Sequence, residues 1–206
     1  MDVLPPWPTG LIDVWRATNG VRFTARPILP QDRDAFAAMF ARLSRTTSYN
    51  RFHGSVALPA YLLDAMTQVD QCQQLALVIT TAHAGNEVIV ADARYVLDES
   101  GAAAEFAIVV EDRWQRMGLA MRAMQMLLVA ARENGVPVLY GSVLRSNAGM
   151  LAFMQRCGFT CATDPSDRCL IRASARPADA LACLAADDDF ATGFDADTLV
   201  DGVSAS

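Results

Sequence analysis

One stretch of the sequence constrains the fold more than any other: an apolar run that passes through a short loop directly into a long helix. The run, Ala102 to Glu111 (AAAEFAIVVE), is apolar on both faces except at Glu105. Such a composition is typical of a central strand in a sheet that is covered on both sides. The helix, Met117 to Asn134, is ended by Gly135 and Pro137. This strand and helix predict an α/β fold.

The loop between the strand and the helix has the composition of a phosphate-binding turn. In VEDRWQRMGLA, Gln115, Gly118 and Ala120 follow the spacing Q-x-x-G-x-A. The first amides of a helix lack partners inside the helix and lie at its positive end, so a loop wrapped around them can bind a pyrophosphate. Arg113 and Arg116 offer guanidinium groups to the same anion. On its own, the motif is more typical of an ordinary helix start.

The rest of the chain predicts further strands and helices around this unit. We expect strands over 21–28, 75–81, 87–97 and 138–143, with a closing pair over 158–163 and 168–173. We expect helices over 31–43, 59–68 and 148–157. The polar segment Ser44 to Ser55 is predicted to be a connection. Residues 178–186 favour one more helix, and the rest of the tail is predicted to be disordered.

The composition indicates one neutral domain with an acidic tail. A chain of 206 residues, 52% of them hydrophobic, can bury one sizeable core. Its 17 arginines and 23 acids give a net charge of −6, but residues 173–206 hold seven of the acids and one arginine, which leaves 16 of each upstream. There is no basic run, and no apolar stretch of the roughly 20 residues that cross a bilayer. We therefore expect no nucleic-acid and no membrane partner.

The amino terminus and the cysteines indicate the cellular compartment of the protein. The start, MDVLPPWPTG, has no basic region followed by an apolar one, which predicts a cytoplasmic protein. Five cysteines without CxxC spacing predict reduced, mostly packed thiols and no metal site. The sequence contains no lysine.

Taken in order, these features resemble one enzyme family. A strand with a lone glutamate, the Q-x-x-G-x-A loop, a long helix, a strand, Asn147, a helix and Gly158-Phe159 resemble the GCN5-related N-acetyltransferase (GNAT) family. Its members transfer an acetyl group from acetyl-CoA to an amine. The resemblance implies a mixed, mostly antiparallel sheet, splayed in the middle between the Ala102 and Val138 strands, with helices on both faces.

The resemblance covers Val21 to Ala173 and implies a division of the chain. We expect an N-terminal extension over 1–20, a GNAT acetyltransferase domain over 21–173, and an acidic, largely disordered C-terminal tail over 174–206.

The amino-terminal half of the chain resembles one particular group of enzymes within this family. RPILPQDRDAFAAMFARLSRTTSYNRFHG is most similar to the acetyltransferase domain of bacterial protein lysine acetyltransferases, down to Arg51-Phe52. This implies acetyl-CoA as the donor, no metal, and a protein partner with an exposed lysine, such as an acyl-CoA synthetase. A small-molecule amine acetyltransferase and a non-catalytic acyl-CoA-binding regulatory module stay open as alternatives.

The resemblance also assigns roles to residues. Backbone groups of Val109 and Val110 would bind the pantetheine arm. The pyrophosphate would be held by Gln115, Arg116, Met117, Gly118, Leu119 and Ala120. Asn147 falls where the family has a cofactor-contacting asparagine, although it is equally an ordinary N-cap. Met154 stands where the family often has a tyrosine that protonates the leaving thiolate.

Glu105 is the candidate general base. A carboxylate in the middle of an apolar strand must be paired or hydrated. An amine acceptor with a pKa of about 10.4 arrives as ammonium, and a partly desolvated glutamate can take its proton directly or through one water. The matching glutamate is the proposed base of the resembled enzymes. The alternative is a structural ion pair with Arg94 or Arg145.

Overall fold

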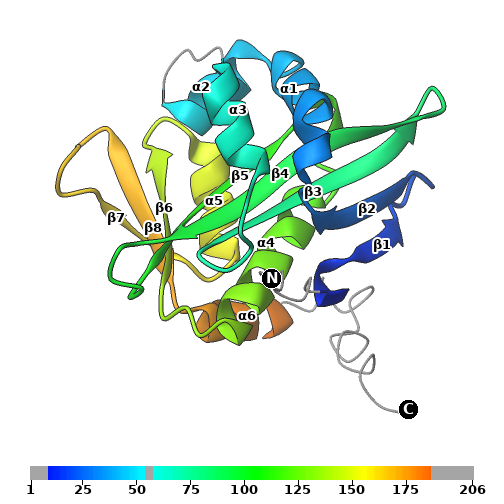
Figure 1. Ribbon diagram of the computed structural model, residues 1–206. Coiled ribbons are helices and arrows are strands. Elements are labelled where there is room, and N and C mark those ends of the chain that lie inside the picture. The colour runs from blue at the N-terminus through cyan, green and yellow to red at the C-terminus, as the bar shows by residue number, and fades with distance from the viewer. Residues whose placement is uncertain (1–8, 54–57, 187–206) are drawn as a thin grey trace, which may run out of the picture.

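The protein is built around an eight-stranded sheet with the strand order β1-β2-β3-β4-β5-β6-β8-β7 (Figure 1). The structure is a computed structural model that describes residues 9–53 and 58–186. The strands are β1 (Asp13–Arg16), β2 (Arg22–Pro27), β3 (Gln74–His83), β4 (Asn86–Leu97), β5 (Ala104–Val110), β6 (Leu139–Leu144), β7 (Thr160–Thr163) and β8 (Leu170–Ala175). Neighbouring strands are antiparallel except β5 and β6, which are parallel. The predicted mixed, mostly antiparallel sheet is confirmed.

The sheet opens between β5 and β6. These strands pair at only two register positions, Ala104 with Leu139 and Glu105 with Tyr140. On its other side β5 pairs with β4 along its whole length, from Ala104 to Val110. The rest of β5 therefore has unpaired backbone on the side toward β6, and the predicted splay lies where the sequence analysis placed it.

Helices cover both faces of the sheet. The helices α1 (Arg33–Ala41), α2 (Arg45–Phe52) and α3 (Ala60–Thr67) lie on one face, and α4 (Leu119–Glu133), α5 (Ala148–Arg156) and α6 (Pro177–Ala186) lie on the other (Figure 1). Three short 3-10 turns complete the elements: η1 (Thr9–Leu11), η2 (Pro30–Asp32) and η3 (Asp112–Trp114).

Each face of the sheet has its own apolar core. Phe106 and Val110 of β5 belong to the larger core with α4, whereas Val109 belongs to the smaller core with α1 and α3. Successive side chains of a strand point to opposite faces. Glu105 and Ala107 therefore share the α1–α3 face with Val109.

The segment Ser44 to Ser55 is not the connection that the sequence analysis predicts, because most of it forms α2. The Oγ of Ser44 caps this helix and accepts a hydrogen bond from the Thr47 N–H at 3.1 Å. Phe52 packs on Phe40 with ring centroids 5.4 Å apart. No residue of α2 is fully buried, so the segment lacks the apolar periodicity by which an amphipathic helix is predicted. Residues 54 and 55 lie outside the described residues.

Both ends of the described chain add to the sheet and the core. Within the predicted N-terminal extension, β1 pairs with β2, and Arg122 of α4 donates a hydrogen bond to Asp13. The predicted helix over 178–186 is confirmed as α6, and Leu184 joins the larger core. The domain limits stay a prediction, and the predicted disorder of residues 187–206 lies outside the described residues.

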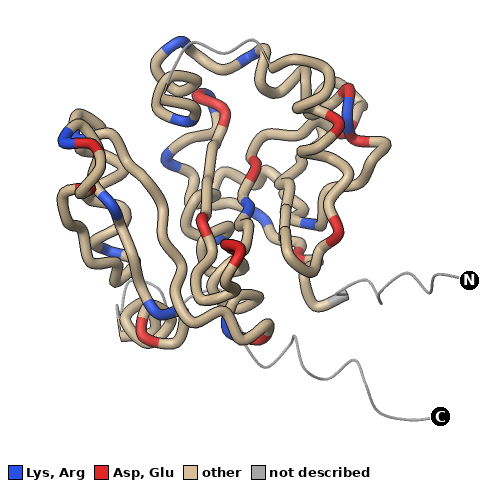
Figure 2. Tube along the Cα trace, turned by 60° about the vertical axis from the view of Figure 1, so that its left-hand side comes forward, with Lys and Arg blue, Asp and Glu red and all other residues tan. Residues whose placement is uncertain are grey.

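Charge is distributed over the whole trace. Acidic and basic residues of the described ranges are interspersed rather than gathered into one basic stripe (Figure 2). Within these ranges, no helix has both the length and the apolar character that a membrane crossing needs. The same residues hold no group of three or more His, Cys, Asp and Glu side chains placed to bind a metal ion.

Candidate active site

A pocket of about 890 Å³ opens where β5 and β6 separate. Residues 106–110 of β5 line one side, and residues 141–143 of β6 line the other. The loop before α4, the start of α4, one side of α2 and part of α5 close the remaining walls. Pockets of this size hold cofactor-sized ligands. The unpaired backbone of β5 is thus exposed inside a cavity.

The loop between β5 and α4 has the geometry that the predicted phosphate site requires. Arg116 and Gly118 both have left-handed backbone, with φ of 62° and 81°. A Cβ at Gly118 would meet no protein atom within 4 Å, so the space beside this residue is open. The N–H of Arg122 bonds the carbonyl of Gly118 at 3.0 Å, which makes it the first amide of α4 with an intrahelical partner. The preceding amides, at residues that line the pocket, are left for a ligand.

The predicted cofactor residues meet at this pocket with one exception. Its lining contains Val109, Val110, Gln115, Arg116, Gly118, Leu119, Ala120 and Asn147. Met117 is not part of the lining; it packs against the larger core. The side chain of Asn147 accepts a hydrogen bond from the Met150 N–H at 3.1 Å and caps α5. Its N-cap role is confirmed, and its contact with the cofactor stays a prediction.

Arg113 differs from the sequence-based expectation. Its guanidinium lies 2.8 Å from the buried carboxylate of Glu111, which also pairs with Arg42 at 2.9 Å. Arg113 is outside the pocket lining, whereas Arg116 is part of it. Of the two loop arginines that the sequence analysis named, Arg116 is therefore the one available to an anion in the pocket.

Helix α2 forms a wall of the pocket because Asp112 holds it against the loop. The Asp112 carboxylate accepts hydrogen bonds from the N–H and Oγ of Ser44, at 2.8 and 2.7 Å, and from the Oγ1 of Thr47 at 2.7 Å. Burial favours the neutral acid, but these hydrogen bonds outweigh it and lower the pKa of Asp112. The Nε2 of Gln115 donates to the Val110 carbonyl at 3.1 Å, which ties the loop to β5. The sequence analysis predicted a connection here and not a helix, and the local signal for the helix start is the capping Ser44.

Glu105 lies next to the pocket and is not part of its lining. It stands on β5 between Val96 of β4 and Tyr140 of β6, and its side chain is exposed. The expected ion pairs are not formed within the described residues, because Arg94 pairs with Asp92 and Arg145 bonds Thr163. Glu105 is thus exposed at the surface and not buried in the sheet, and its role as a base stays a prediction.

The pocket provides no obvious side-chain acid for a leaving thiolate. Among the described residues that line it, none is Tyr, His, Lys or Cys. Met154 is fully buried in the larger core. Cys157 is also fully buried, and this burial raises the pKa of its thiol to about 12, so it is neutral near neutral pH and not a nucleophile. The prediction of mostly packed thiols is confirmed for Cys157 and is wrong for Cys72, Cys169 and Cys183, which are exposed.

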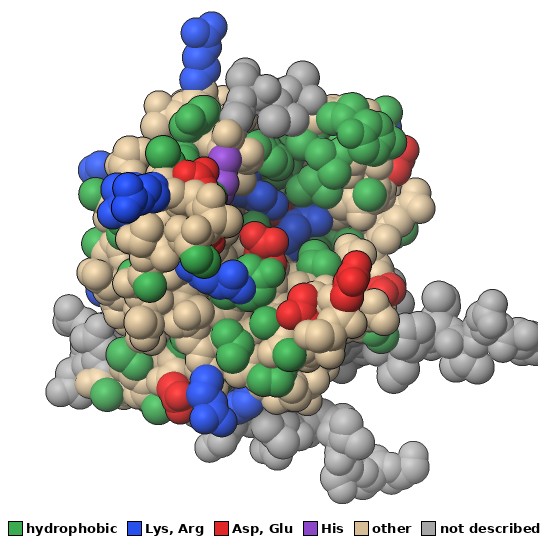
Figure 3. Space-filling view, turned by 90° about the vertical axis from the view of Figure 1, so that its left-hand side faces the viewer, with side chains coloured by type: hydrophobic (Ala, Val, Ile, Leu, Met, Phe, Trp, Pro, Cys, Tyr) green, Lys and Arg blue, Asp and Glu red, His purple; other side chains and the backbone are tan. Residues whose placement is uncertain are grey.

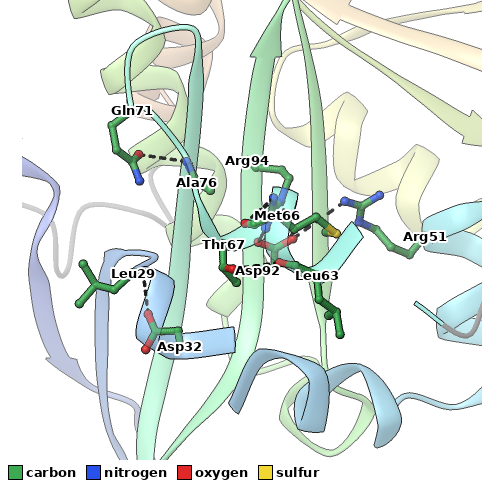
Figure 4. Close-up of polar contacts among 10 residues, drawn as sticks. All are labelled: Leu29, Asp32, Arg51, Leu63, Met66, Thr67, Gln71, Ala76, Asp92 and Arg94. Atoms are coloured by element: carbon green, nitrogen blue, oxygen red, sulfur yellow. Dashed lines mark hydrogen bonds and ion pairs between the residues drawn. The ribbon is translucent and has the colours of Figure 1, made fainter. Parts of the chain in front are cut away.

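A charged cluster that the sequence analysis did not single out lies on the α1–α3 face (Figure 4). Asp92, fully buried on β4, accepts hydrogen bonds from the Nη2 and Nε of Arg94 at 2.6 and 3.0 Å. The Nη1 of Arg94 donates to the Met66 carbonyl at 3.1 Å. Arg51 of α2 reaches the same carboxylate with its Nη2 at 3.9 Å. Figure 3 shows basic and acidic side chains together in a hollow of the surface.

Comparison with known proteins identifies this arrangement. A sequence model of the acetyltransferase (GNAT) domain matches residues 22–160. An acetyltransferase of Pseudomonas aeruginosa is 30% identical over 151 residues, which make up 72% of this chain and 81% of that protein. The acetyltransferase Pat of Mycolicibacterium smegmatis is 32% identical over 141 residues, 68% of this chain and 42% of the relative. The chain thus spans less than half the length of Pat.

Comparison of the fold with solved structures also finds a GNAT domain. The GNAT domain of S. lividans PAT matches with a TM-score of 0.74 at 22% identity, over 82% of this chain and 99% of that one. The matched region contains the splayed strands, the loop with its left-handed glycine and the helix α4. The chain therefore belongs to the GNAT family and is an acetyl-CoA-dependent N-acetyltransferase.

Proposed function

We propose that the protein transfers an acetyl group from acetyl-CoA to the ε-amine of a lysine on another protein, with Glu105 as the general base. The observation that carries this proposal is the pocket between β5 and β6. A loop whose geometry suits a phosphate lies at one end, and an exposed carboxylate stands beside its other end.

The donor would lie along β5. The amides at the start of α4 suit the pyrophosphate, and the backbone edge of β5 that faces β6, around Val109 and Val110, suits the amides of the pantetheine arm. From Val110 to Glu105 the strand covers about 17 Å. A thioester at the end of an extended arm would thus approach Glu105.

The acceptor would react by direct attack. Glu105, or one water between it and the substrate, takes a proton from the ammonium, and the free amine forms a bond to the thioester carbon. The bond from carbon to sulfur then breaks, the electron pair leaves with the CoA sulfur, and the second proton of the attacking nitrogen passes to the thiolate or to water. Because a thiolate is a fair leaving group near neutral pH, the reaction does not require an acid at the position of Met154.

The shape of the acceptor side favours a protein. The N-cap Ser44 and Thr46, Thr47 and Asn50 of α2 give the pocket a polar wall. Asp112, the one acidic residue in the described lining, is engaged by Ser44 and Thr47, so the lining offers no acidic cluster to attract a polyamine. The similarity to bacterial protein lysine acetyltransferases supports the same acceptor, and an acyl-CoA synthetase is the partner that we propose.

Acceptor identity is tested by incubating the protein with labelled acetyl-CoA and either a cell lysate or a panel of small amines. We expect label on lysines of lysate proteins, with an acyl-CoA synthetase among them. A lysate whose lysines have been blocked by reductive methylation is the control and should stay unlabelled. Label on the small amines alone would contradict the proposed acceptor and leave the fold and the donor site unaffected.

The lack of lysine gives a second expected result. Arginine stays protonated and is not a nucleophile, so the only free amine of this chain is its amino terminus. Long incubation with acetyl-CoA should therefore add at most one stable acetyl group, measured as intact mass. A second stable group would contradict this expectation, unless peptide mapping placed it on a cysteine thioester.

A further inference from the structure

Arg51 is an incompletely bonded guanidinium in the pocket wall. Its side chain is only 15% exposed, and its Nε is buried without a hydrogen-bond partner among the described residues. Its contact with Asp92 is long, at 3.9 Å (Figure 4). Arg94, in contrast, makes three hydrogen bonds to the same carboxylate and a fourth to the Met66 carbonyl. Arg51 therefore keeps donors that the described residues do not use.

The buried charge around Arg51 is also unbalanced. Asp92 supplies one negative charge, and Arg94 already takes its best hydrogen bonds. Burial lowers the pKa of Arg51, and the attraction of Asp92 only partly offsets this. The guanidinium still carries its charge near neutral pH, because arginine does not lose its proton in proteins. A buried cation without full hydrogen bonding is costly, and an anionic ligand would relieve that cost.

Arg51 lies on the side from which an acceptor would enter. It lines the pocket together with Ala107 and Val109, whose side chains share the α1–α3 face with Glu105. Glu105 is close enough for its charge to raise the pKa of Arg51. The described residues form no hydrogen bond or ion pair between them, so the donors of Arg51 stay available. This face thus presents an exposed carboxylate and an incompletely bonded guanidinium near each other.

We propose that Arg51 binds a carboxylate that the acceptor carries close to its reacting amine, and so determines acceptor specificity. The inference rests on the proposed function, in which the ammonium approaches Glu105. The carboxylate would then lie at Arg51, and each charge of the substrate would meet its opposite. An aspartate or glutamate beside the lysine of a protein supplies this group, and the α-carboxylate of a free amino acid has the same chemistry.

The test compares acceptor peptides that differ only in one neighbour of the lysine, glutamate or glutamine. A charge-assisted hydrogen bond of this kind should give the glutamate peptide an advantage of about 10- to 100-fold in kcat/KM. The Arg51→Gln variant should lose that preference, and Arg51→Lys should keep part of it, because lysine retains the charge without the planar geometry. Arg45→Gln removes an exposed guanidinium from the same helix and should keep the full preference.

Two further arms identify the source of the carboxylate. Free lysine is compared with lysinamide, and acetyl-CoA is compared with succinyl-CoA, whose acyl group ends in a carboxylate. We expect the Arg51→Gln variant to change the preference for acidic peptides and leave the ratio of the two donors unchanged. If Arg51→Gln changes only the ratio of activity with acetyl-CoA and succinyl-CoA, the proposal is overturned, because Arg51 would then bind a carboxylate of the acyl group. If Arg51→Gln changes only the preference for free lysine over lysinamide, the bound carboxylate is the α-carboxylate of a free amino acid.

Direct binding separates this inference from the proposed function. Calorimetry of the same peptides with the CoA complex measures the glutamate preference without turnover. A preference that depends on Arg51 in a protein that transfers no acetyl group would support the inference and overturn the proposed function. Equal binding of both peptides to wild type and Arg51→Gln, with normal acetyl transfer, would overturn the inference alone. Circular dichroism confirms that each variant is folded.

Discussion

Replacing Glu105 by glutamine is expected to lower turnover by roughly 100-fold or more while the affinity for acetyl-CoA stays unchanged. Glutamine keeps the shape of the side chain but cannot accept a proton from the ammonium. Because Glu105 is exposed and has no ion pair among the described residues, the substitution leaves no buried group unpaired and should not change stability. The measurement is kcat across a range of pH, with calorimetry for the donor and thermal unfolding as a check.

The matched control is Glu99→Gln, which removes an exposed carboxylate from the turn just before β5. This variant should keep wild-type turnover, which excludes a general effect of surface charge. Near-normal turnover of Glu105→Gln at neutral pH would show that the carboxylate is not the base.

The Gly118→Val variant is expected to bind acetyl-CoA about tenfold more weakly or worse, in a domain that still folds. At φ of 81° a β-branched residue is strained by about 1–2 kcal/mol, and its side chain enters the open space where the pyrophosphate would lie. The added Cβ meets no protein atom within 4 Å, so no clash with the core accompanies the change. Isothermal titration calorimetry with acetyl-CoA measures the loss.

Two controls separate loss of the ligand site from backbone strain. Gly101→Val introduces the same residue at φ of 69° in another open turn, away from the pocket lining, and should leave the affinity unchanged. Asparagine tolerates left-handed backbone, so Gly118→Asn should be less strained than the valine variant and still obstruct the pyrophosphate. If a folded Gly118→Val protein binds acetyl-CoA as tightly as wild type, the loop is not a phosphate site.

Local sequence patterns were sufficient to predict the part of the fold that forms the donor site. The apolar run of β5, the small residues of the loop and the long apolar periodicity of α4 are each encoded within a few residues. The resemblance to a known family added the splay between β5 and β6, which depends on strands more than 30 residues apart. These features are local or belong to a known pattern, so they could be predicted.

The remaining features depend on tertiary contacts. Helix α2 is stabilised by Asp112, which lies more than 60 residues away along the chain, and its own sequence has no apolar stripe. The ion pair between Asp92 and Arg94 was not predicted either, because the sequence analysis names Arg94 only as a possible partner of Glu105. Met117 follows the motif spacing, but its side chain packs against the core and is not part of the pocket lining. Motif position alone could not reveal which way that side chain turns.

Release of free CoA thiol in the presence of acetyl-CoA and a lysine-rich protein tests the central claim most directly. We predict thiol release that depends on both substrates, with one acetyl-lysine formed on the acceptor for each thiol and a strong loss in Glu105→Gln. Tight binding of acetyl-CoA without acceptor-dependent thiol release would contradict the claim and identify the chain as an acyl-CoA-binding module.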